Sequence, residues 1–248
     1  MFFVPPRARP FEAVLYSSTF YVKKSLLNIT IKYGLIARYL SMFRVSTLYI
    51  IDDVNDVRLL TTLKNIHDYL FTPPYARKNI RKKRSLTYVG LIDPIDIPPS
   101  VKEKEWIEGD IRLNVKGNIG IGDIRDQGTK WVIITDSGKN KTQVYKGPVF
   151  YSGYRLKFVA EKDILNLDRL VIGSRNGNDT LTRAEDLRKL YRKKGITIVV
   201  GPPKGGITET FFGRGIMLNF VKEQGVYNVR SEEALFCALS IVNAIVDE

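Results

Sequence analysis

Three glycine-marked loops in the last third of the chain are the segments best suited to hold a ligand. They are 171–179 (VIGSRNGND), 196–209 (ITIVVGPPKGGITE) and 216–233 (IMLNFVKEQGVYNVRSEE). Short β-branched runs that end in glycine predict strands whose carboxyl ends open into tight turns. Backbone N–H and C=O groups can approach a ligand there without an intervening Cβ. Because ligands of open α/β sheets bind at that edge, we expect a pocket built from main chain.

The middle loop has the glycine spacing of a phosphate-binding P-loop but lacks its cation. In GPPKGGIT, Ile207 stands where the P-loop requires the lysine that meets the nucleotide phosphates. An ATPase or GTPase is therefore disfavoured. A small neutral or positively charged cofactor is the better hypothesis.

The composition describes a globular protein with an excess of positive charge. The 248 residues are 44% hydrophobic and 26% charged, which suits one large domain or two small ones. The formal net charge of +13 favours a polyanionic partner, and the first hundred residues carry 15 lysines and arginines against 7 acidic residues. No apolar stretch approaches the roughly 20 residues of a membrane span. Cys237 and His67 are the only residues of their types, so we expect a cytoplasmic protein without a cysteine-based metal site.

The sequence pattern in the N-terminal and C-terminal parts of the chain predicts alternating strands and helices. The helices carry apolar residues at spacings of three and four, as in the series Leu59, Leu63, Ile66 and Leu70. A Thr-x-x-Glu spacing at Thr182 is typical of a helix start. Strands are expected at 11–16, 47–51, 154–159, 170–172, 197–200 and 216–220, and helices at 25–43, 59–70, 182–195 and from about 231 onward.

The middle of the chain has a different pattern. Between 85 and 152, short β-prone runs at 86–92, 106–115, 131–135 and 142–145 are separated by turn residues, which predicts a small all-β, OB-like barrel. The simplest architecture is one α/β domain formed by 1–84 and 153–248, with this barrel inserted at 85–152.

Motifs along most of the chain carry a family resemblance. They are GLIAR (34–38) with the later Phe43-Arg44-Val45 and Ile51-Asp52-Asp53, PPYAR (73–77), YSGYR (151–155), the loop from Gly201 to Glu209, Gln224-Gly225, and VRSEEA (229–234). With these, the chain resembles the SPOUT class of α/β-knot RNA methyltransferases, and within it the subfamily with an inserted OB-type barrel. The last motif is the most specific.

The resemblance implies a trefoil-knotted α/β fold, a homodimer, S-adenosyl-L-methionine as cofactor and RNA as substrate. Uridine in ribosomal RNA, methylated at N3, is the favoured target. Arg175 and Asn176 stand where the subfamily has Glu and Arg, Lys222 replaces a frequent Pro, and Asn228 replaces a usual Thr. If one loop does not touch the cofactor, we expect it to be the first.

The implied cofactor residues lie on all three loops. The implied cofactor residues are Ile172, Gly173, Ser174, Gly201, Pro202, Gly205, Gly206, Ile207, Gln224, Gly225, Val229 and Arg230. The alternative is that the glycines after these strands form ordinary turns without a ligand.

Three polar side chains are candidates for a role in catalysis. Arg38 lies on the polar side of its helix, and the resemblance places such an arginine near the dimer interface, within reach of the substrate in the partner's site. It would hold the target nucleotide or a phosphate, or it is simply solvated. Glu209 and Asn219 would orient a base or help its proton leave. Alternatively, Glu209 binds the ribose hydroxyls, or either residue caps a helix.

A basic cluster precedes the predicted barrel and suits an RNA backbone, although a solvated loop would also tolerate it. It consists of Arg77, Lys78, Arg81, Lys82, Lys83 and Arg84, with Tyr75 available for stacking. We predict structural roles for His67, on a polar helix face, and for Cys237. The rival to a methyltransferase is a non-enzymatic RNA- or DNA-binding protein that retains the fold.

Overall fold

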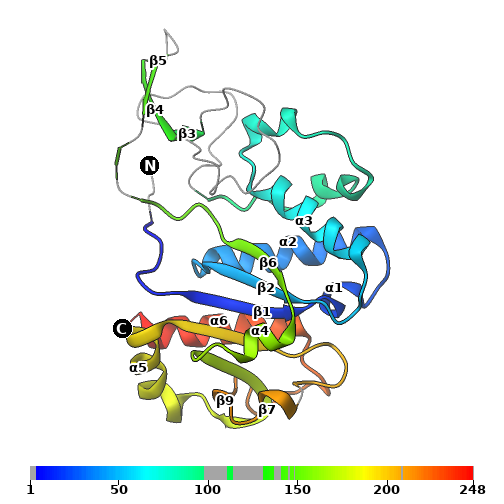
Figure 1. Ribbon diagram of the computed structural model, residues 1–248, viewed down its shortest axis with the longest axis vertical. Helices are drawn as coiled ribbons and strands as arrows, with labels where there is room; N and C mark the ends of the chain where they lie inside the picture. Colours follow the sequence, from blue (N-terminus) through cyan, green and yellow to red (C-terminus); the bar gives the residue numbers. More distant parts are fainter. Residues whose placement is uncertain are drawn as a thin grey trace.

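A six-stranded parallel sheet forms the centre of the structure (Figure 1). The computed structural model describes residues 4–97, 111–113, 131–136, 141–144, 146–147, 149–207 and 209–247. The strand order is β6-β2-β1-β8-β7-β9, and every neighbouring pair is parallel. Each strand overlaps a predicted one: β1 Phe11–Tyr16, β2 Thr47–Ile51, β6 Arg155–Val159, β7 Leu170–Asp179, β8 Ile196–Val200 and β9 Ile216–Asn219. Parallel pairing places all their carboxyl ends at one edge.

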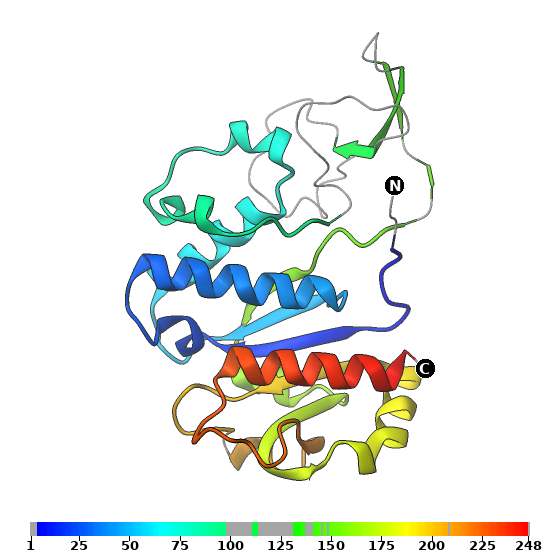
Figure 2. The ribbon, with the colours of Figure 1, turned by 180° about the vertical axis from the view of Figure 1, so that it is seen from behind.

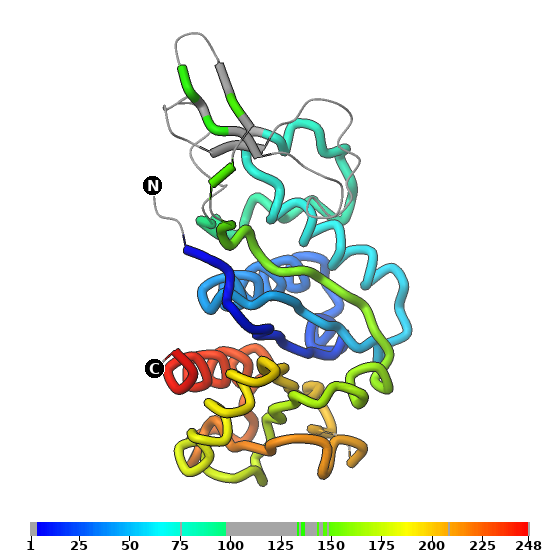
Figure 3. The backbone as a smooth tube through the Cα atoms, turned by 60° about the vertical axis from the view of Figure 1, so that its left-hand side comes forward, coloured from blue at the N-terminus to red at the C-terminus, as the bar shows by residue number. Residues whose placement is uncertain are grey.

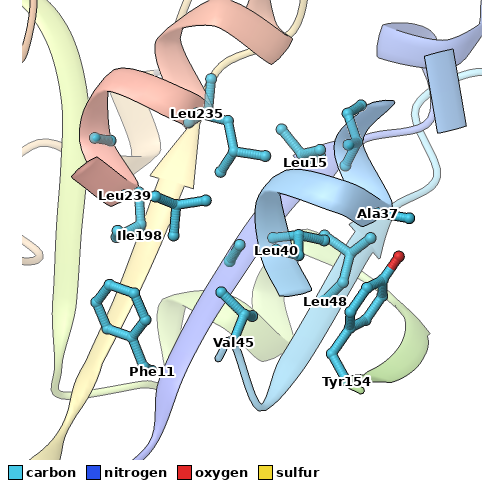
Figure 4. Packing of buried hydrophobic residues seen from close by; sticks show 14 of the residues in the cluster. Phe11, Leu15, Ala37, Leu40, Val45, Leu48, Tyr154, Ile198, Leu235 and Leu239 are labelled. Carbon is cyan, nitrogen blue, oxygen red and sulfur yellow. The ribbon is translucent and has the colours of Figure 1, made fainter. Parts of the chain in front are cut away.

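Two long helices, α2 and α6, lie side by side against one face of this sheet (Figure 2). Figure 4 shows Leu40 of α2 and Leu235 and Leu239 of α6 packed against Leu15 of β1 and Ile198 of β8. All five side chains are fully buried. The helices are α1 Ser18–Tyr21, α2 Leu26–Met42, α3 Val57–Phe71, α4 Glu161–Leu165, α5 Ala184–Lys194 and α6 Ser231–Val246.

Alternation along β1 explains how the sheet is buried on both faces. Phe11, Ala13 and Leu15 belong to the large core under α2 and α6, whereas Val14 and Tyr16 belong to a smaller core on the opposite face. That smaller core is completed by Ile164 of α4 and Phe211 of the short 3₁₀ helix η6, Glu209–Phe211. A period of two is what a strand requires when both faces are covered by apolar groups.

The two ends of the chain meet in the middle of the sheet. β1 pairs with β2 on one side and with β8 on the other, where Phe11 lies opposite Ile196. Figure 3 follows β1, in dark blue, between the paler blue segments and the yellow to red ones. Arg7 adds an ion pair of 2.6 Å to Asp247. An α/β fold with a parallel sheet is therefore confirmed, and strands from both ends of the chain contribute to that sheet.

A buried carboxylate links three neighbouring parts of the sheet. Glu12 of β1 is 5% exposed and accepts hydrogen bonds from Arg169 Nη2 (2.8 Å), Thr197 Oγ1 (2.8 Å) and Tyr49 Oη (3.2 Å). A buried charge is tolerated when it is paired and hydrogen-bonded in this way. Burial, followed by the Glu12 charge, raises the pKa of Tyr49.

The predicted strand at 86–92 is wrong. This stretch forms two 3₁₀ helices, η2 Arg84–Leu86 and η3 Val89–Leu91, after the earlier η1 Pro74–Asn79. Leu86 and Val89 pack against the large core, so their burial follows the spacing of three typical of 3₁₀ turns.

The predicted capping box at Thr182 is also wrong. Asp179 organises this turn instead: its carboxylate accepts from Leu181 N at 2.9 Å, and its carbonyl accepts from Thr182 Oγ1 at 2.7 Å. Residues Leu181–Arg183 therefore form the 3₁₀ helix η5, and α5 begins only at Ala184. The helix ends at Gly195, whose φ of 85° lies in the left-handed region.

Between 85 and 152 the described residues include a three-stranded antiparallel sheet. Its strands are β3 Ile111–Leu113, β4 Trp131–Asp136 and β5 Lys141–Val144, with a bulge in β4 between Ile134 and Asp136. They coincide with three of the predicted β-runs. The barrel with its boundaries at 85 and 152 stays a prediction.

Candidate cofactor site

The three glycine loops leave the sheet at the same edge because their strands are neighbours. The order β8-β7-β9 places the ends of all three side by side. The first loop differs from the prediction, since β7 continues to Asp179. Its pairing with β9 shifts register between Gly173 and Asn178, so the intervening residues leave the regular ladder. A Cβ on Gly177 would lie 2.4 Å from the carbonyl carbon of Leu218, so this irregular crossing needs glycine.

Side-chain hydrogen bonds join the first loop to the third. Arg175 Nη2 donates to the main-chain oxygen of Tyr227 at 2.6 Å and to Asn228 Oδ1 at 3.0 Å. In the other direction, Asn219 Nδ2 donates to the carbonyl of Arg175 at 3.1 Å, while Asn219 Oδ1 accepts from Val221 N at 3.0 Å. Arg175 and Asn219 therefore hold the two loops together.

The third loop is also fastened internally and to the end of β7. Gln224 Nε2 donates to the main-chain oxygens of Val226 (2.8 Å) and Tyr227 (3.0 Å). Lys222 Nζ lies 3.1 Å from Asp179 Oδ2. The hydrogen bond from the Leu181 N–H, followed by the one from Lys222, lowers the pKa of Asp179. The loop therefore has a defined shape through its own polar groups.

The second loop folds back on itself and joins the start of α6. Ser231 Oγ donates to the carbonyl of Gly201 at 3.0 Å. A Cβ on Gly201 would lie 2.9 Å from both the carbonyl carbon of Gly206 and the nitrogen of Ile207, so the two sides of the loop nearly touch. Gly205 and Gly206 have φ values of 90° and 68°, and neither has an atom within 4 Å of its Cβ position. Their main chain is left open on that side.

The start of α6 is stabilised by its own carboxylates. Glu233 Oε2 accepts from the Arg230 N–H at 2.9 Å, and Glu232 Oε1 lies 2.9 Å from Lys32 Nζ. Carboxylates in a first turn also interact favourably with the helix dipole. Both carboxylates therefore have structural partners at the start of α6.

The predicted cofactor residues fall into three groups by exposure. Ile172 is fully buried at the end of the regular part of β7. Gly205, Gly206, Gly225 and Arg230 are exposed. The remaining ones are half-buried: Gly173, Ser174, Gly201, Pro202, Ile207, Gln224 and Val229. Ile207 packs against the smaller core that contains Ile172 and Val199, so the residue that replaces the P-loop lysine serves as an apolar anchor.

The three predicted catalytic side chains lie on three different elements, η6, β9 and α2. Glu209 is exposed at the start of η6, beside the second loop. Asn219 uses both ends of its amide to position the loops. Arg38 lies on α2, where Nη1 donates to the carbonyl of Ile95 at 2.5 Å and lies 3.8 Å from Asp96 Oδ2. Its side chain is 45% exposed.

Two cations of the basic cluster, Arg77 and Lys83, are anchored by hydrogen bonds. Arg77 Nε donates to the carbonyl of Thr72 at 3.0 Å, and its guanidinium lies 4.7 Å from the Tyr69 ring centroid. Lys83 Nζ donates to Asn65 Oδ1 at 2.6 Å. The other four cations are exposed: Lys78, Arg81, Lys82 and Arg84. The Tyr75 side chain lies outside the described part of the structure.

The expected polar position of His67 is wrong. Its Nδ1 lies 3.0 Å from Tyr33 Oη, and its ring packs 4.7 Å from Phe71 and 5.1 Å from Tyr154, measured between centroids. The signal was present, because His67 follows Leu63 by four residues and therefore lies near the apolar stripe. The links made by Arg175 and Ser231 had no such local signal.

The described part of the chain contains neither a membrane-spanning helix nor a metal-binding cluster of side chains. No described helix has the length and hydropathy needed to cross a membrane. Among the same residues, no group of three or more His, Cys, Asp or Glu side chains is arranged to hold a metal ion.

Comparison with solved structures finds distant likenesses over nearly the whole chain. A putative methylase family protein from Neisseria gonorrhoeae has 8% identity and a TM-score of 0.45, with 99% of this chain and 88% of that one covered. TrmJ from Z. mobilis ZM4 has 9% identity and a TM-score of 0.38, with coverage of 97% and 69%. A probable methylase family protein from Haemophilus influenzae Rd KW20 has 13% identity and a TM-score of 0.37, with coverage of 96% and 64%.

Comparison by sequence gives a narrower result. No curated protein matches the chain. Residues 14–116, which include α2, β2, α3 and the basic cluster, match the model of the protein family described as "Putative RNA methyltransferase".

Proposed function

We propose that the protein is an S-adenosyl-L-methionine-dependent RNA methyltransferase. The observation that carries the proposal is the set of three interlinked glycine loops at the carboxyl edge of β7, β8 and β9. The family match at 14–116 supports RNA methylation independently, because it lies outside all three loops. The net charge of +13 supports a polyanionic substrate.

The second loop fits S-adenosyl-L-methionine better than a nucleoside triphosphate. The main chain at Gly205 and Gly206 is open, and Ile207 offers an apolar contact rather than a cation. Ile172, Gly173 and Ser174 would line a second side, and Gln224, Gly225, Val229 and Arg230 a third. When bound, the cofactor supplies an activated methyl group on a sulfonium, so the protein's contribution is positioning and electrostatic stabilisation.

The substrate in this proposal is a base in structured RNA, with uridine N3 of ribosomal RNA favoured. Glu209 is the exposed carboxylate beside the second loop, and it would orient the base or assist loss of its proton. Asn219 contributes by holding the first and third loops in place. Arg38 would hold the target nucleotide or a phosphate through charge-assisted hydrogen bonds.

A homodimer is part of the proposal, because α2 carries apolar side chains on its outer face. Leu27, Ile31 and Leu35 recur every four residues and are 39%, 42% and 42% exposed. Such a stripe is typical of a helix that packs against another one. Arg38 lies three residues further along the helix, near the proposed interface. The trefoil knot implied by the resemblance belongs to the same proposal.

Calorimetric titration with S-adenosyl-L-methionine is the first test. Binding in the micromolar range is expected, and absence of binding at millimolar cofactor would refute the proposed methyltransferase function. Mass spectrometry of RNA nucleosides from cells lacking the protein then identifies the product. Loss of 3-methyluridine is the expected result, whereas loss of a different methylated nucleoside would keep the enzyme and correct the target.

The second candidate is an RNA- or DNA-binding protein that retains the fold without turnover. One observation favours it: the carbonyl of Tyr227 in the third loop already accepts from Arg175 and Gln224, so that group is occupied by the protein itself. Strong RNA binding without cofactor binding would select this candidate.

A further inference from the structure

A pocket of about 380 Å³ lies beside the C-terminal half of α3, away from the glycine loops. Tyr69, Ile80 and Leu86 supply apolar lining. Arg77, Arg81, Lys82 and Lys83 supply four cations, and none of the described residues that line the pocket is acidic. The volume is within the usual range for small-molecule sites, and the combination of apolar lining with uncompensated positive charge selects an anion that also has an apolar face.

Two of the four cations are fixed as part of the pocket wall. Arg77 Nη2 lies 3.4 Å from the carbonyl of Leu70, in addition to its bond with Thr72 and its contact with the Tyr69 ring. Its guanidinium plane is therefore held in one orientation. Lys83 is held by Asn65, which itself donates to Ser85 Oγ at 3.1 Å.

The other two cations are available to a ligand. Arg81 and Lys82 are exposed, and within the described residues neither forms a hydrogen bond or an ion pair. Adjacent cations beside an apolar cavity suit a phosphate attached to a planar group. A free inorganic anion would make no use of Tyr69, Ile80 and Leu86.

We infer that this pocket binds one nucleotide of a single RNA strand, with its base against the apolar lining and its phosphate at Arg81 and Lys82. Unpaired bases in RNA are recognised by stacking on aromatic rings or guanidinium planes, while the backbone is held by cations. The inference rests on the proposed RNA substrate. It deepens that proposal by assigning a second contact, separate from the cofactor loops, which would position the strand for the reaction.

The charge part of the inference is tested with two matched double variants of the full chain. Arg81→Gln/Lys82→Gln removes the two free cations of the pocket, and Lys78→Gln/Arg84→Gln removes two exposed cations of the same cluster that do not line it. Binding of a fluorescein-labelled single-stranded RNA is measured by anisotropy between roughly 50 and 200 mM salt.

We expect the pocket variant to bind about tenfold more weakly and its logarithmic salt slope to become shallower by about 0.7, the value for one lost phosphate contact on a single strand. The control should lose less than about threefold. Equal losses in both variants would mean a diffuse basic surface and would overturn the inference.

The cavity itself is tested without a change in charge. Thr87→Trp places a large ring in the pocket, and Tyr88→Trp serves as the control on a neighbouring residue that does not line it. Thr87→Trp should reduce RNA affinity and leave the salt slope unchanged, with circular dichroism confirming the fold. RNA binding equal to that of the unmodified protein would overturn the inference.

Competitors identify the ligand. Uridine monophosphate should displace the labelled RNA weakly, and inorganic phosphate at equal ionic strength should not. If the pocket variants lose uridine monophosphate binding but keep RNA binding, the site is one for free nucleotides and the inference fails. Calorimetry with S-adenosyl-L-methionine should be unaffected by all four variants, so the failure of this inference is distinguishable from the failure of the proposed enzyme.

Discussion

Arg175 donates to the main-chain oxygen of Tyr227 across 2.6 Å, so a residue that departs from the pattern of the resembled subfamily helps to join the first loop to the third. The Tyr227 ring stays 88% exposed, with the guanidinium 6.0 Å from its centroid. Arg175 therefore positions the third loop whether or not the first loop touches the cofactor.

Replacing Arg175 with Ala should loosen the third loop. Because two hydrogen bonds to that loop are lost, we expect the affinity for S-adenosyl-L-methionine to fall about tenfold. Arg175→Lys should recover only part of it, since an ammonium group lacks the planar donor geometry. Calorimetry measures both, with Arg192→Ala on exposed α5 as the control. Unchanged affinity in Arg175→Ala would show that the link is dispensable.

Alanine at Gly201 should damage the second loop more than alanine at Gly206. The new Cβ at 201 would meet main-chain atoms at 2.9 Å, whereas at 206 it meets open space and only the positive φ is unfavourable. That backbone strain costs about 1–2 kcal/mol. We expect Gly201→Ala to abolish cofactor binding and Gly206→Ala to weaken it. Gly90→Ala, in open space elsewhere, is the control; a reversed order would contradict the loop geometry.

Arg38→Ala separates two roles for this residue. If Arg38 holds RNA, methylation by the purified protein should fall at least about tenfold while cofactor affinity is kept. If it only fastens the segment at Ile95 and Asp96, activity should stay and thermal stability should drop by a few degrees. Asp96→Asn tests the second role alone, since it removes the ion pair and leaves Arg38 in place.

Stability should fall in alkaline solution because of Tyr33. Burial, followed by Tyr154, raises its pKa well above the ordinary value, so the folded state disfavours the tyrosinate. The stabilisation is fully present below the unfolded pKa of about 10 and is lost as the pH rises toward the folded pKa, with a slope of up to about 1.4 kcal/mol per pH unit. Urea unfolding between pH 7 and 11 measures this slope.

Tyr33→Phe provides the control for that slope. At pH 7 it should cost about 1 kcal/mol through the lost contacts with His67 and Tyr154. Above pH 10 its stability should decline less steeply than that of the unmodified protein. Parallel declines would assign the alkaline instability to other groups, of which Tyr49 is the first to examine.

Glu12→Gln should be among the most destabilising single changes in the sheet. It leaves Arg169 facing a neutral amide in a largely buried site, for which about 3 kcal/mol is expected. Thr197→Val removes one hydrogen bond to the same carboxylate and one accepted from Arg169 Nε, but leaves the charge pair in place, and should cost about 1–2 kcal/mol. Glu185→Gln, at an exposed pair on α5, should change stability by less than about 0.5 kcal/mol. Similar values for all three would show that Glu12 is not a buried anchor.

The strands and long helices were predictable because their signals are local. The apolar run of β1 predicts a strand, and the spacings of three and four among Leu59, Leu63, Ile66 and Leu70 predict the buried face of α3; these residues are buried as expected. The turn at Asp179 was not predictable, because several local hydrogen-bond patterns were open to its polar side chains. The Asp179 carboxylate bonds the Leu181 N–H and the Thr182 hydroxyl bonds the Asp179 carbonyl, in place of the expected capping box. Residues 86–92 have a high β-propensity, but they form 3₁₀ turns that pack against α3, because tertiary contacts outweigh local preference here.

The candidate site could be predicted in position but not in construction. Glycines after apolar runs indicated the loops, and parallel pairing brings those loops to one edge. The links through Arg175, Asn219 and Ser231 connect positions that are 30 to 53 residues apart in the chain. The periodicity of apolar residues does not predict contacts over such separations, since these contacts depend on the register that β7 adopts against β9.

The pairing of β1 with β8 has a consequence for the order in which the chain is made. Because Phe11 pairs with Ile196, β1 lacks one of its two neighbouring strands during synthesis until some 185 further residues have been made. Between the synthesis of β1 and that of β8, the β1 edge that will pair with β8 has no strand beside it. A slow codon stretch or a chaperone acting before β8 emerges would therefore affect the yield of folded protein more than one acting after it.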